Sequence, residues 1–189
     1  MHSKIKEIRM RLGLSEAQIS SLLNISSYKY RRYENGSLTI SVEVLILLSI
    51  MYDISIDLFV FDRISVNLIF EEKSIKKILQ FSEEKRVLIL ESNMCKYCAY
   101  SCNSINYRVV KNILAKFLSE FSKNLQYLRC SQLLEISEIS ALLKLNDEYY
   151  MNLERGKIWP SVYDLVGLST VFVKPVNELL GIKNETDKL

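Results

Sequence analysis

Glycine and proline are scarce in this chain of 189 residues, which contains five and two of them, respectively. Sheet proteins turn often, and glycine and proline are the residues that tight turns favour. Their scarcity therefore predicts an all-helical fold rather than a sheet. Neither residue occurs between Gly36 and Gly156, so we expect no flexible linker in the middle of the chain.

Residues typical of catalytic sites are equally scarce. Histidine occurs once, at position 2, and no glycine-rich phosphate loop is present. Without a histidine-based nucleophile pair or a paired set of carboxylates, we expect no enzyme and no cofactor. The most apolar run, residues 42–52, is much shorter than the roughly 20 residues of a membrane span. The N-terminus lacks the apolar segment of a secretion signal, so we expect a cytoplasmic protein with no membrane partner.

The most informative feature present is an internal repeat. Residues 8–61 match residues 128–181 without a gap, at a shift of 120 positions. A repeat of this size indicates one structural unit used twice. Side chains that recur in both copies include the pairs Tyr30 and Tyr150, Glu34 and Glu154, Gly36 and Gly156, Leu45 and Leu165, and Leu48 and Leu168.

Each repeat is predicted to form five short helices. In the first repeat, apolar spacing indicates a helix over residues 4–12 that ends at Gly13. Ser15 and Gln18 form a capping box for the second helix, and Asn24 suits the left-handed turn that follows. The last three helices are expected over about 27–33, from Ser41 to 52, and around residues 56–59.

The pattern of these residues resembles the lambda-repressor-like, or Xre-type, helix-turn-helix domain. The matching residues run Leu14-Ser15-x-x-x-Ile19-Ser20-x-x-Leu23-Asn24-Ile25-Ser26 and then Tyr30-x-x-Tyr33-Glu34-Asn35-Gly36, and the second repeat has Tyr150-x-x-Leu153-Glu154-Arg155-Gly156. The resemblance covers about two thirds of the chain. It implies an all-α protein with two five-helix domains, at residues 1–62 and 122–182, joined by a helical connector, residues 63–121, and followed by a disordered tail, residues 183–189.

The resemblance also implies a surface that reads double-stranded DNA. In this family the third helix lies in the major groove, with its first residues on base edges. It places Ser27, Tyr28 and Arg32 toward the bases, and Lys29, Arg31 and Asn35 near the phosphates. With Ser26, these residues form the predicted DNA-binding set. Glu16 departs from the family, which often has glutamine there, and a carboxylate facing phosphates would repel them.

The charge distribution favours DNA binding by the first repeat. Residues 1–36 carry seven basic and three acidic side chains, whereas residues 122–189 carry eight basic and nine acidic ones. Because DNA affinity depends largely on neutralised phosphates, the first repeat is the better candidate. The alternative is that these charges are ordinary solvated helix faces.

The second repeat loses this surface. Asp147 and Glu148 occupy the positions of Ser27 and Tyr28, and Met151-Asn152 replace Arg31-Arg32. Two carboxylates in a phosphate-lined groove are unfavourable. A capping box at Glu135 is not expected. The matched core positions stay apolar, which predicts a folded copy that serves self-association or another protein: Ile139, Leu142, Leu143, Leu165 and Leu168.

Two charged pairs recur at the same shift. Arg9 with Glu34 and Arg129 with Glu154 suit salt bridges that tie the first helix to the end of the third. We expect them to stabilise the fold and assign them no direct functional role.

The connector is expected to contain a helix starting near Ser82 and a second, amphipathic helix over residues 107–121. Its apolar stripe through Val110, Ile113, Leu114 and Phe117, or the second repeat, could form a homodimer contact. The competing arrangement is a monomer whose two repeats face each other.

Four cysteines lie near this region: Cys95, Cys98, Cys102 and Cys130. Cys95 and Cys98 have the spacing of metal ligands, but no second such pair exists. We expect them to pack as small buried groups, with no metal bound; metal binding and redox sensing are the alternatives.

Taken together, the residues and the resemblance predict a sequence-specific transcriptional regulator that binds DNA as a homodimer and represses by occupying an operator. The alternative is a protein-interaction module that kept the fold, such as an antitoxin or a phage-borne inhibitor of host defence. In that reading, the second domain is where a protein partner would bind.

Overall fold

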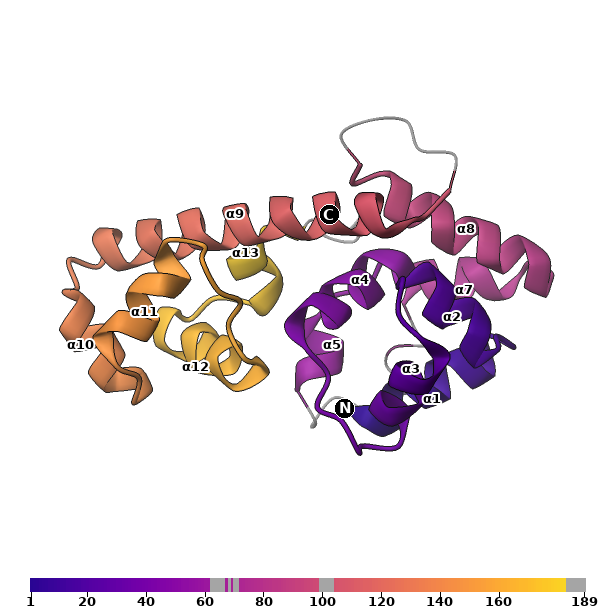
Figure 1. The fold of residues 1–189 in the computed structure, drawn as a ribbon, viewed down its shortest axis with the longest axis horizontal. Coiled ribbons are helices and arrows are strands. Elements are labelled where there is room, and N and C mark those ends of the chain that lie inside the picture. Colours follow the sequence, from indigo (N-terminus) through magenta and orange to yellow (C-terminus); the bar gives the residue numbers. More distant parts are fainter. Residues whose placement is uncertain (62–66, 68, 70–71, 99–103, 183–189) are drawn as a thin grey trace. The chain divides into compact units, whose positions relative to one another are not determined.

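The structure is a computed structural model that describes the chain except residues 62–66, 68, 70–71, 99–103 and 183–189. Every regular element among the described residues is a helix (Figure 1). The predicted all-helical class is confirmed. Cys102 and the predicted disordered tail lie outside the described residues. No helix in the described part of the chain is long and apolar enough to cross a membrane.

Contacts divide the chain into two compact units, with the division between Ile113 and Leu114. The first unit contains α1 (His2–Arg11), α2 (Glu16–Leu22), α3 (Ser27–Glu34), α4 (Val42–Tyr52), α5 (Asp57–Val60), α7 (Lys73–Leu79) and α8 (Glu83–Cys95). The long helix α9 (Tyr107–Ser131) crosses the division. The second unit continues with α10 (Ile136–Leu143), α11 (Asp147–Glu154), α12 (Val162–Phe172) and α13 (Val176–Leu180).

Helix α4 forms the centre of the first unit. All but one of its eleven residues are buried, and the exception is Glu43. A helix that is apolar on every side needs cover on every side. Helix α8, from the expected connector, packs against α4 and supplies part of that cover. The α7–α8 segment therefore belongs to the compact first unit rather than lying apart from it.

Helix α9 is ten residues longer than the helix predicted over 107–121. It continues unbroken to Ser131, so that its last turns take the place of α1 in the second unit. Its apolar stripe is buried within the chain: Ile113, Phe117, Phe121 and Leu125 are at most 1 % exposed. The stripe through Val110, Ile113 and Phe117 is therefore not an available dimer surface, and that expectation is wrong.

The backbone of the second unit repeats that of the first at the same shift of 120 positions. Left-handed residues recur as Gly13 and Leu133, Asn24 and Lys144, Gly36 and Gly156, and Asp53 and Val173, with φ between 52° and 75°. The Ser49 hydroxyl donates to the Ile54 carbonyl at 2.6 Å, and Ser169 donates to Lys174 at the same distance. Local conformation thus recurs even where the side chain differs.

Two expectations for the second unit are wrong. Glu135 does form a capping box, because its side chain accepts from the backbone of Glu138, whose carboxylate in turn accepts from the Glu135 amide at 2.7 Å. A carboxylate can cap in this way as well as the hydroxyl of Ser15 does. Leu142 is 61 % exposed, although the matching Leu22 is buried. The other four expected core positions are buried or half-buried.

Candidate nucleic-acid interface

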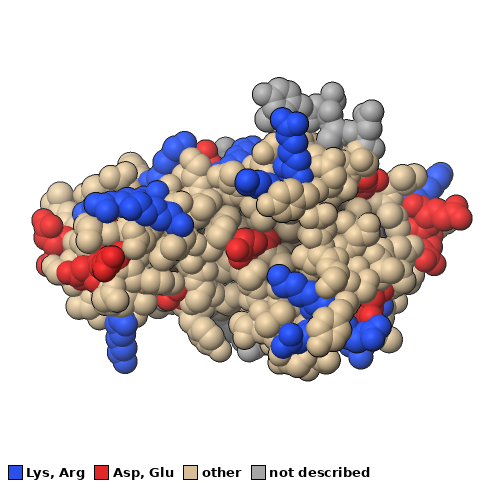
Figure 2. Space-filling view, viewed as in Figure 1, with Lys and Arg blue, Asp and Glu red and all other residues tan. Residues whose placement is uncertain are grey.

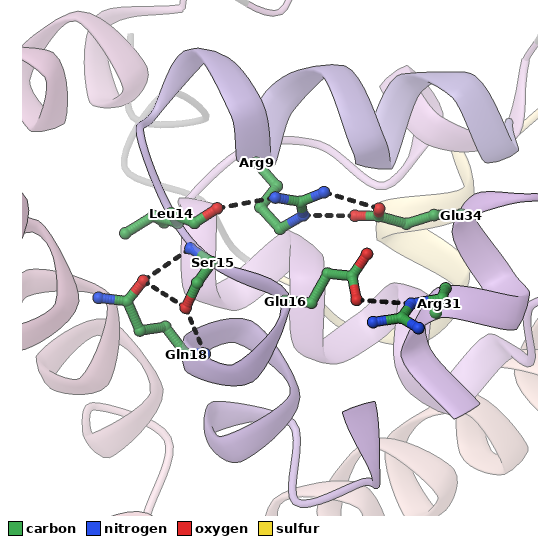
Figure 3. A network of polar contacts seen from close by, with 7 residues as sticks. All are labelled: Arg9, Leu14, Ser15, Glu16, Gln18, Arg31 and Glu34. Carbon is green, nitrogen blue, oxygen red and sulfur yellow. Dashed lines mark hydrogen bonds and ion pairs between the residues drawn. The ribbon is translucent and has the colours of Figure 1, made fainter. Parts of the chain in front are cut away.

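The pair α2 and α3 is built by short-range signals at each end. The Ser15 hydroxyl accepts from the Gln18 amide at 3.2 Å, and the Gln18 side chain accepts in return from the Ser15 amide at 2.7 Å (Figure 3). Asn24 turns the chain with φ 53°. Ser26 then caps α3, because its hydroxyl accepts from the Lys29 amide at 3.1 Å. These caps fix where α3 begins and which side chains its first turn exposes.

Ser27 faces α2 rather than solvent alone. Its hydroxyl lies 2.8 Å from the hydroxyl of the buried Ser20, which also donates to the Ala17 carbonyl at 3.1 Å. Ser27 thus joins α3 to α2 and keeps only part of its hydrogen-bonding capacity for another molecule. Ser20 recurs as Ser140 in the second repeat, and this recurrence is the sequence feature that could have indicated the contact.

The exposed face of α3 carries the predicted reading residues. Tyr28 is 71 % exposed, and Lys29 and Arg31 are exposed. Arg32 is half-buried: its guanidinium lies 5.9 Å from the Tyr28 ring centroid and donates to the Ser37 carbonyl at 3.2 Å. Lys29 lies 5.9 Å from the Tyr33 ring centroid. Contacts of this kind restrict the cations to one side of the helix.

Asn35 ends α3, and its side chain is turned back into the following loop. The amide oxygen of Asn35 accepts from the Ser37 amide at 3.0 Å and also from the Ser37 hydroxyl. This pair of contacts shapes the turn after the helix. The side-chain oxygen of Asn35 is thereby occupied in the first unit.

Glu16 and Arg31 form an ion pair across α2 and α3. The Arg31 Nε lies 2.9 Å from the Glu16 Oε2, with the arginine side chain 65 % exposed and the glutamate 27 % exposed (Figure 3). An exposed pair of this kind adds little stability. It does offset the charge of one of the cations on α3. The carboxylate that departs from the family pattern thus has a partner within the chain.

If α3 binds DNA as the sequence predicts, Glu16→Gln should strengthen that binding at every sequence. Removing the carboxylate releases Arg31 for a phosphate and removes one repulsion, so the salt dependence should steepen by about one phosphate contact. Fluorescence anisotropy across a salt series measures both effects. Lys6→Gln, a cation outside α2 and α3, serves as the control. Affinity that is unchanged or lower in Glu16→Gln would contradict the assignment of this face to DNA.

A second ion pair locks α1 to the end of α3. The guanidinium of Arg9 contacts both carboxylate oxygens of Glu34, at 2.6 and 2.8 Å, and donates to the Leu14 carbonyl at 2.8 Å (Figure 3). The hydrogen bond to Glu34 raises the pKa of Arg9, against the opposing effect of burial. Burial also raises the pKa of the adjacent Tyr30 phenol. Arg9 and Glu34 thus hold α3 in place without belonging to its exposed face.

The second unit contains the same lock. Arg129 contacts the two Glu154 oxygens at 2.6 and 3.2 Å and donates to the Leu134 carbonyl at 2.9 Å. The hydrogen bond to Glu154 raises the pKa of Arg129. Two residues that are far apart in sequence therefore meet in the same way in each unit, as the matched pairs suggested.

The face of α11 that corresponds to the exposed face of α3 is acidic. Asp147 accepts from the Ser140 hydroxyl, in place of the Ser27 contact with Ser20, and Glu148 is exposed. In the view of Figure 2, acidic side chains lie over α10, whereas lysine and arginine lie over the part of the first unit that carries α1 and α3. The two units thus share a backbone and differ in charge.

The described cysteines are less buried than expected. Cys95 and Cys98 are half-buried and Cys130 is exposed, so the expectation that they pack as buried groups is wrong. The reason for Cys130 is its position on the solvent side of α9, which the spacing of the cysteines did not reveal. Within the described residues, no group of three histidine, cysteine or acidic side chains is placed to hold a metal ion.

Comparison with known proteins gives one match. Residues 5–59 match a family described as helix-turn-helix, which is a DNA-binding, non-enzymatic domain. The matched residues extend from α1 to α5 and include nearly all of the first repeat, residues 8–61. No significant match was found among curated proteins, and none among solved structures. Residues 5–59 are therefore similar to the helix-turn-helix family, and this similarity supports a DNA-binding regulator of the Xre type.

Proposed function

We propose that the protein is a sequence-specific regulator that binds double-stranded DNA with α3 and represses transcription by occupying an operator. The observation that carries the proposal is the exposed, cationic face of α3 within a helix-turn-helix domain. Three cations, Lys29, Arg31 and Arg32, lie on this helix, and Ser26 caps its N-terminus. Occupying an operator requires no further activity from the chain.

The roles follow from chemistry and exposure. We assign Tyr28 and Arg32 to base edges, because arginine pairs with guanine and an aromatic ring contacts a thymine methyl group. Lys29 and Arg31 serve the phosphates, and Ser26 and Asn35 flank them at the two ends of α3. Ser27 contributes through its link to Ser20 and through the remaining capacity of its hydroxyl.

We further propose that the second unit is a helix-turn-helix copy that no longer reads DNA. Its left-handed turns, its serine contacts and its Arg129–Glu154 pair match those of the first unit. Asp147 and Glu148 would face phosphates if α11 entered a groove, which is unfavourable. A single reading helix per chain contacts one half-site, so we propose a homodimer that places two copies of α3 about 34 Å apart.

The test is selection of DNA from random duplexes by the purified full chain, followed by binding measurements on the enriched sequence. Arg32→Ala should cost about 1–3 kcal/mol and relax preference at one base pair. Lys29→Ala should weaken binding to all sequences and flatten the salt dependence. The proposal would be contradicted if the selection enriched no sequence. It would also be contradicted if the chain with both Arg32→Ala and Lys29→Ala bound DNA as well as the parent.

A second candidate function is supported by the acidic face of α11. Exposed Glu148 and Asp147 suit a basic protein surface better than a nucleic acid. In this alternative the chain is an interaction module, such as an antitoxin or an inhibitor of host defence, and the second unit binds the partner. The random-duplex selection separates the two, because an interaction module enriches no sequence.

A further inference from the structure

Helix α8 is held firmly in the first unit by one of its sides. It packs against α4, and its residues Leu90 and Met94 are fully buried. The buried Asn93 also donates to the Met51 carbonyl at 2.9 Å, which ties α8 to the last turns of α4. The exposed side of α8 is therefore carried on a helix whose position is fixed.

This exposed side lines an open groove. Positions 85, 88, 89, 92 and 96 of α8 recur at helical spacing, so they share one side of the helix. The groove has a volume of about 460 Å³, and α7, the turn after it and α8 line it with Lys77, Phe81, Lys85, Leu88, Ile89, Ser92, Asn93 and Lys96. These residues form one surface, and all of them belong to the first unit.

The apolar residues of the groove lie between two lysines of α8. Leu88 is 63 % exposed, and Ile89 and Phe81 are half-buried. A leucine this exposed adds little to folding, because most of its surface stays in water in the folded chain. Adjacent apolar groups rimmed by charged residues are typical of a surface that binds another molecule.

The charges that line the groove are all positive. Lys77, Lys85 and Lys96 are exposed, and no acidic residue is among the lining residues. Lys85 lies 6.0 Å from the Phe81 ring centroid, and within the described residues neither Lys77 nor Lys85 forms an ion pair. Lys85 and Lys96 are separated by about 16 Å along the helix axis, since each residue adds about 1.5 Å. The groove thus combines an apolar middle with a cation at each end.

We propose that this groove binds an acidic amphipathic helix of another protein. The apolar stripe of such a helix, with residues at i, i+3, i+4 and i+7, would cover Leu88, Ile89 and Phe81. Its carboxylates, about three turns apart, would meet Lys85 and Lys96. An open groove suits a helix better than a small molecule, because sites for small ligands bury most of the ligand surface. None of the lining residues lies on α2 or α3, so the contact is separate from the proposed DNA surface.

The test uses a labelled, end-capped peptide of about 18 residues, long enough to form a helix alone, with leucines along one side flanked by glutamates. Fluorescence anisotropy with the full chain should show saturable binding, and a scrambled peptide of the same composition should bind at least about tenfold more weakly. Leu88→Glu should weaken binding of the ordered peptide at least about tenfold, because a carboxylate replaces the central apolar contact. The melting temperature should stay unchanged, since Leu88 is exposed and glutamate favours helices.

The control is Met10→Glu, which removes a similarly exposed apolar side chain of the first unit, 60 % exposed and outside the groove. It should leave peptide binding unchanged. Lys77→Glu combined with Lys85→Glu should reverse the preference, so that this chain binds a peptide in which lysines replace the glutamates.

Three results would overturn the inference. The first is no binding of the ordered peptide, or equal binding of its scrambled version, which would reduce the groove to a general cationic patch. The second is a Leu88→Glu chain that binds the peptide as well as Met10→Glu does. The third is a charge-reversed chain that does not prefer the lysine peptide. None of these measurements involves DNA.

Discussion

Arg9→Ala should destabilise the first unit by about 3–5 kcal/mol, the cost of leaving a buried carboxylate without its cation. The side chains of Arg9 and Glu34 are only 11 % and 3 % exposed, so water cannot replace the lost partner. The variant also removes the donor to the Leu14 carbonyl. This lock sets the position of α3, so DNA binding should fall together with stability.

Arg129→Ala is the matched change in the second unit and should cost a similar amount there, because that pair is 15 % and 8 % exposed. The single tryptophan, Trp159, lies in the second unit and reports its unfolding by fluorescence, whereas circular dichroism reports both units. In urea, Arg129→Ala should shift the fluorescence transition. Arg9→Ala should shift mainly the transition seen by circular dichroism.

The control is Glu7→Ala, which breaks the exposed pair with Arg11 and should change stability by less than about 1 kcal/mol. Glu34→Ala combined with Arg9→Ala completes a double-mutant cycle and isolates the energy of the pair. If Arg9→Ala costs no more than the exposed control, the pair is not the lock that its geometry indicates.

Transplanting the acidic residues of the second unit onto α3 should abolish specific DNA binding. Ser27→Asp together with Tyr28→Glu places two carboxylates where the proposal has base edges and phosphates. We expect affinity at moderate salt to fall by about a hundredfold or more, since two repulsions are added and two contacts are lost. Anisotropy with the selected duplex measures the loss.

The fold should survive this change. Asp147 already accepts a hydrogen bond from Ser140 in the second unit, so an aspartate at position 27 can accept from Ser20 in the same way. The melting temperature is therefore expected to remain close to that of the parent. The reciprocal control, Asp147→Ser with Glu148→Tyr, should leave DNA affinity almost unchanged. If both double variants bind like the parent, α3 is not the reading helix.

Much of this architecture could be predicted from the sequence because it depends on short-range signals. The Ser15–Gln18 capping box, the left-handed turn at Asn24 and the strongly apolar helix over 42–52 each involve neighbouring residues, and each occurs where expected. The repeat made it possible to predict some longer-range contacts as well. By matching Arg9 with Arg129 and Glu34 with Glu154, it indicated contacts between residues 25 positions apart.

Contacts that depend on which surfaces meet could not be predicted in this way. The sequence alone determined the helices and turns of the two repeats and the difference in charge between α3 and α11, but not α7 or the full length of α9. Only the tertiary structure decided that α8 packs against α4, that Leu22 is buried while Leu142 stays exposed, and that Glu16 pairs with Arg31. The physical reason is that helix formation is governed within one or two turns. Burial depends instead on segments that are distant in sequence. Helices α7 and α8 lie outside the repeat, so the repeat could not indicate which residues they bury.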